Sequence, residues 1–206
     1  MWKTIFGKKK SMDEMEKLKQ AADSNDFQIY PILKPGDWVG IKAGAIWQTL
    51  VGPQDQPKVV IGFGYDTPEN FIFLNQQHLE KMNSENIISS AYQNLEKYQT
   101  EFEYSEVLNK RVLFSSGPDF SSERILIKEH MLIAHNMLNA EEIVVSIPRR
   151  RCMMVANKDE YEDLIEKFIS LHKKAWYEDE YGNAPITNDL FLLKEGDITS
   201  TIKVKM

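Results

Sequence analysis

Three consecutive arginines, Arg149, Arg150 and Arg151, are the residues whose type and spacing most directly indicate chemistry. They follow Pro148 at a turn between two apolar segments. A guanidinium binds phosphate or carboxylate through two parallel hydrogen bonds, so this turn could hold an anionic ligand or an acidic partner. A solvated surface is the simpler interpretation, because two exposed charges about 6 Å apart in water repel by only about 0.7 kcal/mol. We predict these arginines as the candidate binding residues and assign no catalytic residue.

The four histidines, His78, His130, His135 and His172, lack the spacing of a metal site. His130 and His135 are five positions apart, which places them about 140° apart around a helix and on different faces. His172 lies on the apolar face of an expected helix, where a hydrogen-bonded core histidine is the commoner case. We predict no metal and no cofactor.

Two other patterns are not expected to be sites. Cys152 follows the arginines, but strand alternation turns it away from Arg151, and the methionines after it favour a buried, inert thiol. The segment Gly62-Phe63-Gly64 lacks the third glycine of a nucleotide-binding fingerprint and the helix that must follow it.

Composition restricts the class of protein that carries this turn. The chain has 206 residues, with 25 Lys and Arg against 31 Asp and Glu, and a net charge of −6. A sequence-independent binder of nucleic acid needs surplus cations to displace counterions, so we expect no nucleic-acid partner. The single cysteine forms no internal disulfide and favours a reducing compartment. We predict a soluble, acidic, cytoplasmic protein.

Residues 1–10 form an expected basic N-terminal tail. Trp2, Ile5 and Phe6 share a helical face with four lysines beside them, a composition that could contact an anionic membrane. Three apolar side chains make a poor anchor, however, and neither a signal peptide nor the about 18 apolar residues of a spanning helix occur. We therefore expect a solvated tail and no stable membrane anchoring.

Turn signals and hydrophobic periodicity divide the chain into helices and strands. Helices are expected over 11–22, 76–99, 121–138 and 158–176. Strands are expected over 27–33, 58–65, 71–74, 101–107, 111–115, 142–147, 151–156, 189–193 and 199–204, and the segment 38–51 also suits a strand better than a helix. Hairpins that alternate with helices predict an α+β fold with a largely antiparallel or mixed sheet.

The helix expected over 121–138 is the predicted centre of this fold. Apolar residues such as Ile125, Met131 and Ile133 occur on nearly all its faces, so we expect a central buried helix on which the sheet packs. The following helix is expected to take its N-cap from Asn157. We predict a single α+β domain over 11–206; a two-lobed arrangement is the alternative, and its division would fall near 99–110.

Several segments of the C-terminal half resemble a known family. These segments are Phe120–Leu126, Ile143–Pro148, Met153–Ala156 and Ala184–Leu193. Together they resemble the YtpQ-like family of uncharacterised bacterial proteins, a domain of unknown function, most clearly over 112–198. The triple arginine departs from the family's polar or acidic pattern. The resemblance implies a bacterial cytoplasmic protein of related fold, and it supplies no activity and no catalytic residue.

We expect a non-catalytic binding or accessory protein whose partner is an unidentified protein or a small anionic ligand. Two alternatives stay open: a hydrolase-type enzyme acting on a small anionic substrate, and a small acidic immunity-type protein. A cleft that joins Arg149 or Arg151 to a histidine and carboxylates would favour the enzyme. A flat surface with exposed Trp38, Trp47 or Trp176 would favour partner binding.

Overall fold

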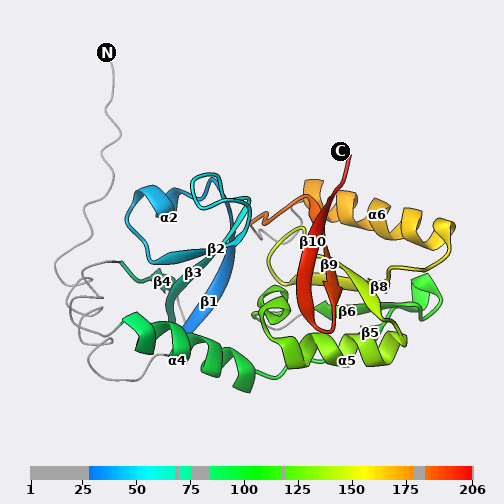
Figure 1. The fold of residues 1–206 in the computed structure, drawn as a ribbon, viewed down its shortest axis with the longest axis horizontal. Coiled ribbons are helices and arrows are strands. Elements are labelled where there is room, and N and C mark those ends of the chain that lie inside the picture. The colour runs from blue at the N-terminus through cyan, green and yellow to red at the C-terminus, as the bar shows by residue number, and fades with distance from the viewer. Residues whose placement is uncertain (1–27, 68–69, 76–83, 117–118, 179–183, 206) are drawn as a thin grey trace, which may run out of the picture.

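The computed structural model describes residues 28–67, 70–75, 84–116, 119–178 and 184–205. The expected basic tail and the helix expected over 11–22 lie outside these residues, as does His78. Within them the strands form two antiparallel sheets, joined by the connection from α4 (Ser84–Lys97) to β5 (Glu103–Tyr104) (Figure 1). The predicted α+β class with antiparallel pairing is confirmed.

The first sheet is built from the N-terminal strands. They are β1 (Ile29–Pro35), β2 (Trp47–Val51), β3 (Val59–Asp66) and β4 (Phe71–Phe73). The order is β1-β3-β2, and β4 also pairs with β3. The segment expected as one strand over 38–51 instead begins with the short helix α2 (Val39–Lys42) before β2. Among the described strands β1 is therefore an edge strand, and part of its backbone finds partners outside the sheet.

The two glycines of Gly62-Phe63-Gly64 serve packing in the middle of β3. A Cβ on Gly62 would lie 3.1 Å from ring atoms of Trp38 and Phe73. A Cβ on Gly64 would lie 2.4 Å from the backbone oxygen of Ile72 on β4. Glycine is needed at both positions because aromatic rings and the neighbouring strand approach the backbone closely.

The second sheet has the order β10-β9-β7-β8-β6-β5. Its strands are β5 (Glu103–Tyr104), β6 (Val112–Ser116), β7 (Glu142–Ser146), β8 (Cys152–Asn157), β9 (Asp189–Lys194) and β10 (Asp197–Lys203). The strands expected in this half pair as the hairpins β5–β6, β7–β8 and β9–β10. The strand expected over 101–107 is wrong in its second part, where Glu106–Leu108 form the 3₁₀ helix η1.

Helices cover both faces of the second sheet (Figure 1). Met131 of α5 (Lys128–Leu138) packs in one apolar cluster with alternate strand residues such as Val145. Phe168 of α6 (Glu162–Tyr177) packs in another with residues of the opposite face, such as Val144. Burial on both faces explains why these strands read as continuous apolar runs. The first cluster also contains Leu33, so the core continues into the first sheet.

The prediction of a central buried helix over 121–138 is wrong in two respects. Residues Ser122–Leu126 form the 3₁₀ helix η2, and the α-helix α5 begins only at Lys128. Leu132 and Ile133 are 36% and 50% exposed, whereas Met131 is fully buried. α5 covers one face of a sheet and turns its other side to solvent, so the sheet is the centre of this half of the molecule.

The predicted N-cap of α6 is also wrong. Asn157 Oδ1 accepts a hydrogen bond from the backbone N–H of Asp159 at 3.0 Å and so stabilises a turn. α6 begins later, at Glu162, after Tyr161, whose side chain makes no capping hydrogen bond. The acidic pair Glu162 and Asp163 in the first turn complements the helix dipole instead.

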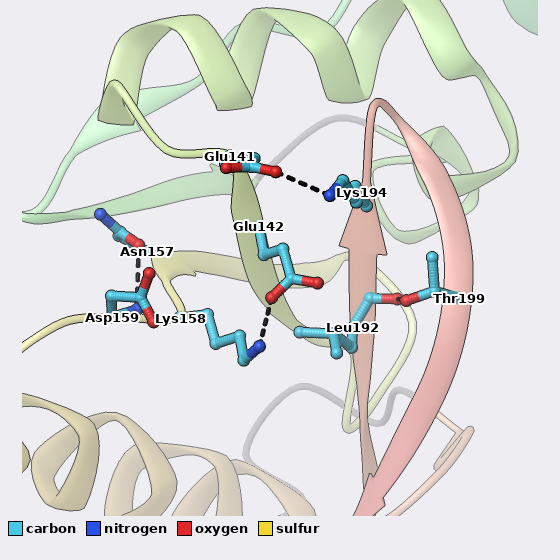
Figure 2. Close-up of polar contacts among 8 residues, drawn as sticks. All are labelled: Glu141, Glu142, Asn157, Lys158, Asp159, Leu192, Lys194 and Thr199. Atoms are coloured by element: carbon cyan, nitrogen blue, oxygen red, sulfur yellow. Dashed lines mark hydrogen bonds and ion pairs between the residues drawn. The ribbon is translucent and has the colours of Figure 1, made fainter.

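Two lysine–glutamate pairs hold one end of the second sheet, as Figure 2 shows. Lys194 Nζ at the end of β9 donates to Glu141 Oε1 at 2.6 Å, and Lys158, just after β8, pairs with Glu142 at the start of β7. The pairs are exposed and each contributes little to stability. They link neighbouring strands at the end of the sheet opposite the arginine turn. The number of domains stays a prediction.

Candidate functional site

The arginine turn connects β7 to β8 and is tied to the segment that leads into β9. The N–H of Arg150 donates to the carbonyl of Ala184 at 3.2 Å, and the N–H of Ile186 donates to the carbonyl of Pro148 at 2.9 Å. Arg151 has a φ of 60°, in the left-handed region that a tight turn requires. These bonds direct the three guanidinium groups into different surroundings.

Arg149 stabilises the C-terminal end of α6. Its Nε donates to the carbonyl of Ala175 at 2.8 Å, and its Nη2 donates to the carbonyl of Trp176 at 2.7 Å. The last carbonyls of a helix have no partner within the helix, and a cation there also complements the helix dipole. Arg149 therefore has a structural role at the end of α6.

Arg151 pairs with an acidic residue on the surface. Its guanidinium forms a salt bridge with Asp119, and its side chain is 46% exposed. Its backbone N–H donates to Ser122 Oγ at 2.9 Å. Because exposed pairs are screened by water and salt, the side-chain interaction contributes little to stability. The backbone bond joins the turn to the start of η2.

Arg150 is the arginine whose guanidinium has no hydrogen-bond partner among the described residues. The residue is half-buried, and its Nε is a buried donor left without an acceptor. Its charge lowers the pKa of Lys34 and acts on the carboxyl groups of Glu123 and Asp66. The turn thus directs one arginine toward the end of β1 and β3.

Lys34, near the end of β1, is the second cation of this site. It is half-buried, and its ammonium lies 5.9 Å from the centre of the Trp38 ring and 5.2 Å from that of Phe73. Burial, and next the charge of Arg150, lowers the pKa of Lys34. Aromatic faces attract a cation weakly and leave its N–H donors available. Lys34 forms no ion pair with another described residue.

A fully buried carboxyl group, that of Glu123, lies behind these cations. Its Oε1 accepts from the N–H of Leu33 at 3.0 Å, and its Oε2 accepts from the hydroxyl of Ser122 at 3.1 Å. Burial raises the pKa of Glu123, while Leu33 and Arg150 oppose that shift. Glu123 thereby gives the edge strand β1 the acceptor that no strand supplies.

Asp66, at the end of β3, completes the charge arrangement. Burial and the nearby charge of Asp119 raise the pKa of Asp66, and Arg150 and Arg151 lower it. The site thus sets Arg150 and Lys34 against two carboxyl groups whose pKa values are both raised. Arg150 and Lys34 are thus the two cations of the site, and Glu123 and Asp66 are its two carboxyl groups.

The structure brings together only part of the predicted site and adds residues that the sequence did not reveal. Arg150 remains available, whereas Arg149 and Arg151 have protein partners. Lys34 and Glu123 were missed because they lie 116 and 27 positions before Arg150. Their only signal is a charged residue inside an otherwise apolar segment, which is typical of many surface positions.

The described histidines are engaged within the protein. His130 stacks on Phe102 at a ring distance of 4.4 Å. His135 Nδ1 lies 2.9 Å from the carbonyl of Ala140, and His172 Nδ1 lies 2.8 Å from Ser146 Oγ. Both His172 and Ser146 are fully buried, so the pair is closed to solvent. The interpretation of His172 as a hydrogen-bonded core histidine is confirmed.

Cys152 directly follows the arginine turn, and its thiol is partly buried. Burial raises the pKa of the Cys152 thiol, which disfavours the reactive thiolate. Within the described ranges, no three side chains of His, Cys, Asp or Glu form a group suited to a metal ion. Trp38, Trp47 and Trp176 are each half-buried, so they do not form the flat aromatic surface that would favour a protein partner.

No family model, no curated protein and no solved structure matches this chain. In the regions that the structure describes, none of the helices combines the length and apolar character needed to cross a membrane.

Proposed function

We propose that this chain is a non-catalytic binding protein that recognises a small anionic group at Arg150 and Lys34. The observation that carries the proposal is the buried Nε of Arg150, a donor with no acceptor among the described residues. Leaving such a donor unpaired costs about 1–3 kcal/mol. A phosphate or carboxylate oxygen supplies the missing acceptor and the opposite charge.

The arrangement favours a compact anion over an extended polyanion. Arg150 and Lys34 lie close enough for the charge of Arg150 to lower the pKa of Lys34, so one bound anion relieves their repulsion. Beyond them lie Asp66 and Asp119, within a chain of net charge −6. These charges repel a long anionic chain, whereas a single group responds mainly to the two nearest cations.

Binding without catalysis agrees with the state of the titratable side chains. General acid–base catalysis needs a group within hydrogen-bond reach of substrate. His130, His135 and His172 are buried, and the Ser146–His172 pair has no exposed surface. The carboxyl group of Glu123 already accepts from Leu33 and Ser122. Because these side chains are buried or already hydrogen-bonded within the protein, they support a recognition role for the site.

The proposal includes the cellular setting expected from the sequence. A cytoplasmic location is supported by the single, half-buried cysteine. Bacterial origin and membership of the YtpQ-like family are supported by the segments over 112–198, in particular Pro185-Ile186-Thr187 with Phe191-Leu192.

A thermal denaturation titration tests this function. Wild-type protein and the Lys34→Gln variant are titrated at low ionic strength with phosphate, citrate and a short acidic peptide. A ligand that binds the native state raises the melting temperature by mass action. We expect a saturable rise with phosphate or citrate that is reduced in Lys34→Gln. Equal rises in both proteins would place the anion elsewhere, and no rise with any ligand would refute the function.

A further inference from the structure

A separate pocket lies where the two sheets meet. Its volume is about 420 Å³, at the lower end of small-molecule sites. Pro35, at the end of β1, and Pro57, just before β3, contribute one wall. The start of β9 and Trp176 near the end of α6 contribute the other. In Figure 1, residues 184–188, just before β9, lie between the two sheets.

An ion pair joins the two walls of this pocket. Lys58 Nζ, just before β3, lies 3.1 Å from Asp189 Oδ2 at the start of β9. The Asp189 side chain is 9% exposed, whereas that of Lys58 is 56% exposed. The carboxylate of Asp189 is thus mostly buried, and the pair connects the two walls of the pocket.

Two further residues of the lining, Asp37 and Lys203, carry opposite charges. Asp37 and Lys203 are exposed, and neither forms an ion pair with another described residue. Asn188, also in the lining, is half-exposed and can supply both an amide donor and an amide acceptor. The aromatic residue Trp176 lies among them. Beside the Lys58–Asp189 pair, the lining therefore offers one anion, one cation, an amide and an aromatic side chain.

The arginine turn supports the pocket from behind. Arg149 fixes the carbonyl of Trp176 at 2.7 Å, and it forms an isolated bridge with Pro185. The N–H of Ile186 donates to the carbonyl of Pro148 at 2.9 Å. Trp176 and the segment before β9 are thus held by backbone hydrogen bonds, which reduces the entropy lost when a ligand binds.

We infer that this pocket binds a free aromatic α-amino acid. Its ammonium group pairs with Asp37, its carboxylate pairs with Lys203, and its ring packs on Trp176. A zwitterion matches the balanced charges of the lining, whereas a simple anion would be repelled by Asp37. The site differs from the proposed anion site, because it does not use Arg150 or Lys34.

Titration calorimetry with L-phenylalanine and L-tryptophan tests this inference. We expect saturable binding to the wild-type protein, and a loss of at least about tenfold in affinity in Asp37→Asn, Lys203→Gln and Trp176→Leu. Lys205→Gln is the matched control, because Lys205 is exposed and outside the lining; it should bind as the wild type does. Circular dichroism verifies that each variant folds.

Analogues that lack one charge complete the test. N-acetyl-L-phenylalanine lacks the ammonium group and L-phenylalanine amide lacks the carboxylate, so both should bind more weakly than the free amino acid. Absence of saturable binding at millimolar concentrations would overturn the inference. So would equal affinities in Trp176→Leu and Lys205→Gln, or tighter binding of the N-acetyl compound, which would indicate a peptide partner. Arg150→Gln should leave this binding unchanged whether or not the anion site exists.

Discussion

The carboxyl group of Glu123 accepts a hydrogen bond from the backbone N–H of Leu33 at 3.0 Å, although the two residues are 90 positions apart in the sequence. Leu33 lies on the edge strand of the first sheet, and Glu123 lies in η2, which precedes α5. Ser122 Oγ donates to Glu123 and accepts from the N–H of Arg151. One short chain of hydrogen bonds thereby links the first sheet to the arginine turn.

Glu123→Ala should destabilise the protein. The change leaves the buried N–H of Leu33 without an acceptor, which costs about 1–3 kcal/mol in the free energy of unfolding. Glu123→Gln keeps an acceptor for Leu33 and should cost less. Urea denaturation measures both variants; equal losses would show that the hydrogen bond to Leu33 contributes nothing.

The effect of Glu123→Gln should depend on pH. Burial raises the pKa of Glu123 above its usual 4.5, so the native state holds the proton more tightly than the unfolded state. Stability from this group is therefore full below pH 4.5 and is lost as the pH rises through the native pKa. Lys34, Arg150 and Ser122 face the carboxyl group and reduce this loss. Denaturation midpoints of Glu123→Gln should rise relative to the wild type toward alkaline pH. A constant difference across that range would contradict the raised pKa.

Acid should destabilise the protein partly through His130. Burial, with the nearby charge of Arg124, lowers the pKa of His130 from 6.5 to about 3. As the pH drops from 6.5 toward 3, His130 is protonated in the unfolded state but stays neutral in the native state. The free energy of unfolding therefore falls over this range. His130→Phe keeps a ring against Phe102 and removes the titration, so its stability should depend less on pH in this range. Parallel pH profiles for both proteins would contradict this assignment.

Arg149→Ala should destabilise the protein more than Arg151→Ala. Arg149 holds two carbonyls at the end of α6, and hydrogen bonds to a charged group contribute about 1.5–3 kcal/mol each. The exposed Arg151–Asp119 pair contributes about 0–1 kcal/mol. Arg149→Lys keeps the charge but lacks the planar guanidinium that donates to both carbonyls. It should therefore recover only part of the lost stability. Thermal denaturation of the two alanine variants measures which one is less stable. Equal losses of stability would contradict the capping role of Arg149.

The outer and inner faces of α5 should respond differently to truncation. Met131 is fully buried, so Met131→Ala should cost about 2–5 kcal/mol. Ile133 is 50% exposed, so Ile133→Ala should cost roughly 1 kcal/mol or less. Chemical denaturation of both variants tests this difference. A loss of stability in Ile133→Ala larger than in Met131→Ala would mean that the exposed face of α5 is covered in solution.

The sequence predicted the strands and hairpins well because their signals are local. Turn residues and apolar runs located the β7–β8 and β9–β10 hairpins within a few residues. The burial of α5 was misjudged because Leu132 and Ile133 are apolar but lie on its solvent side. Apolar character alone does not show which face of a helix has a neighbour.

Of the candidate site, only the run of three adjacent arginines could be predicted from the sequence. The adjacent arginines were visible in the sequence, but their division into three roles depends on the φ of 60° at Arg151 and on bonds to distant segments. Lys34 reaches the site only because β1 packs beside η2. Such contacts are tertiary, and neither residue spacing nor propensity encodes them.

Calorimetric titration of the Arg150→Gln variant with phosphate determines whether Arg150 holds the anion. Lys42→Gln serves as the matched control, because it removes one positive charge at an exposed position outside the site. We predict saturable binding to the wild type and to Lys42→Gln, and a loss of at least about tenfold, or 1.4 kcal/mol, in Arg150→Gln. Equal affinity in Arg150→Gln and Lys42→Gln, or no saturable binding to the wild type, would contradict the account.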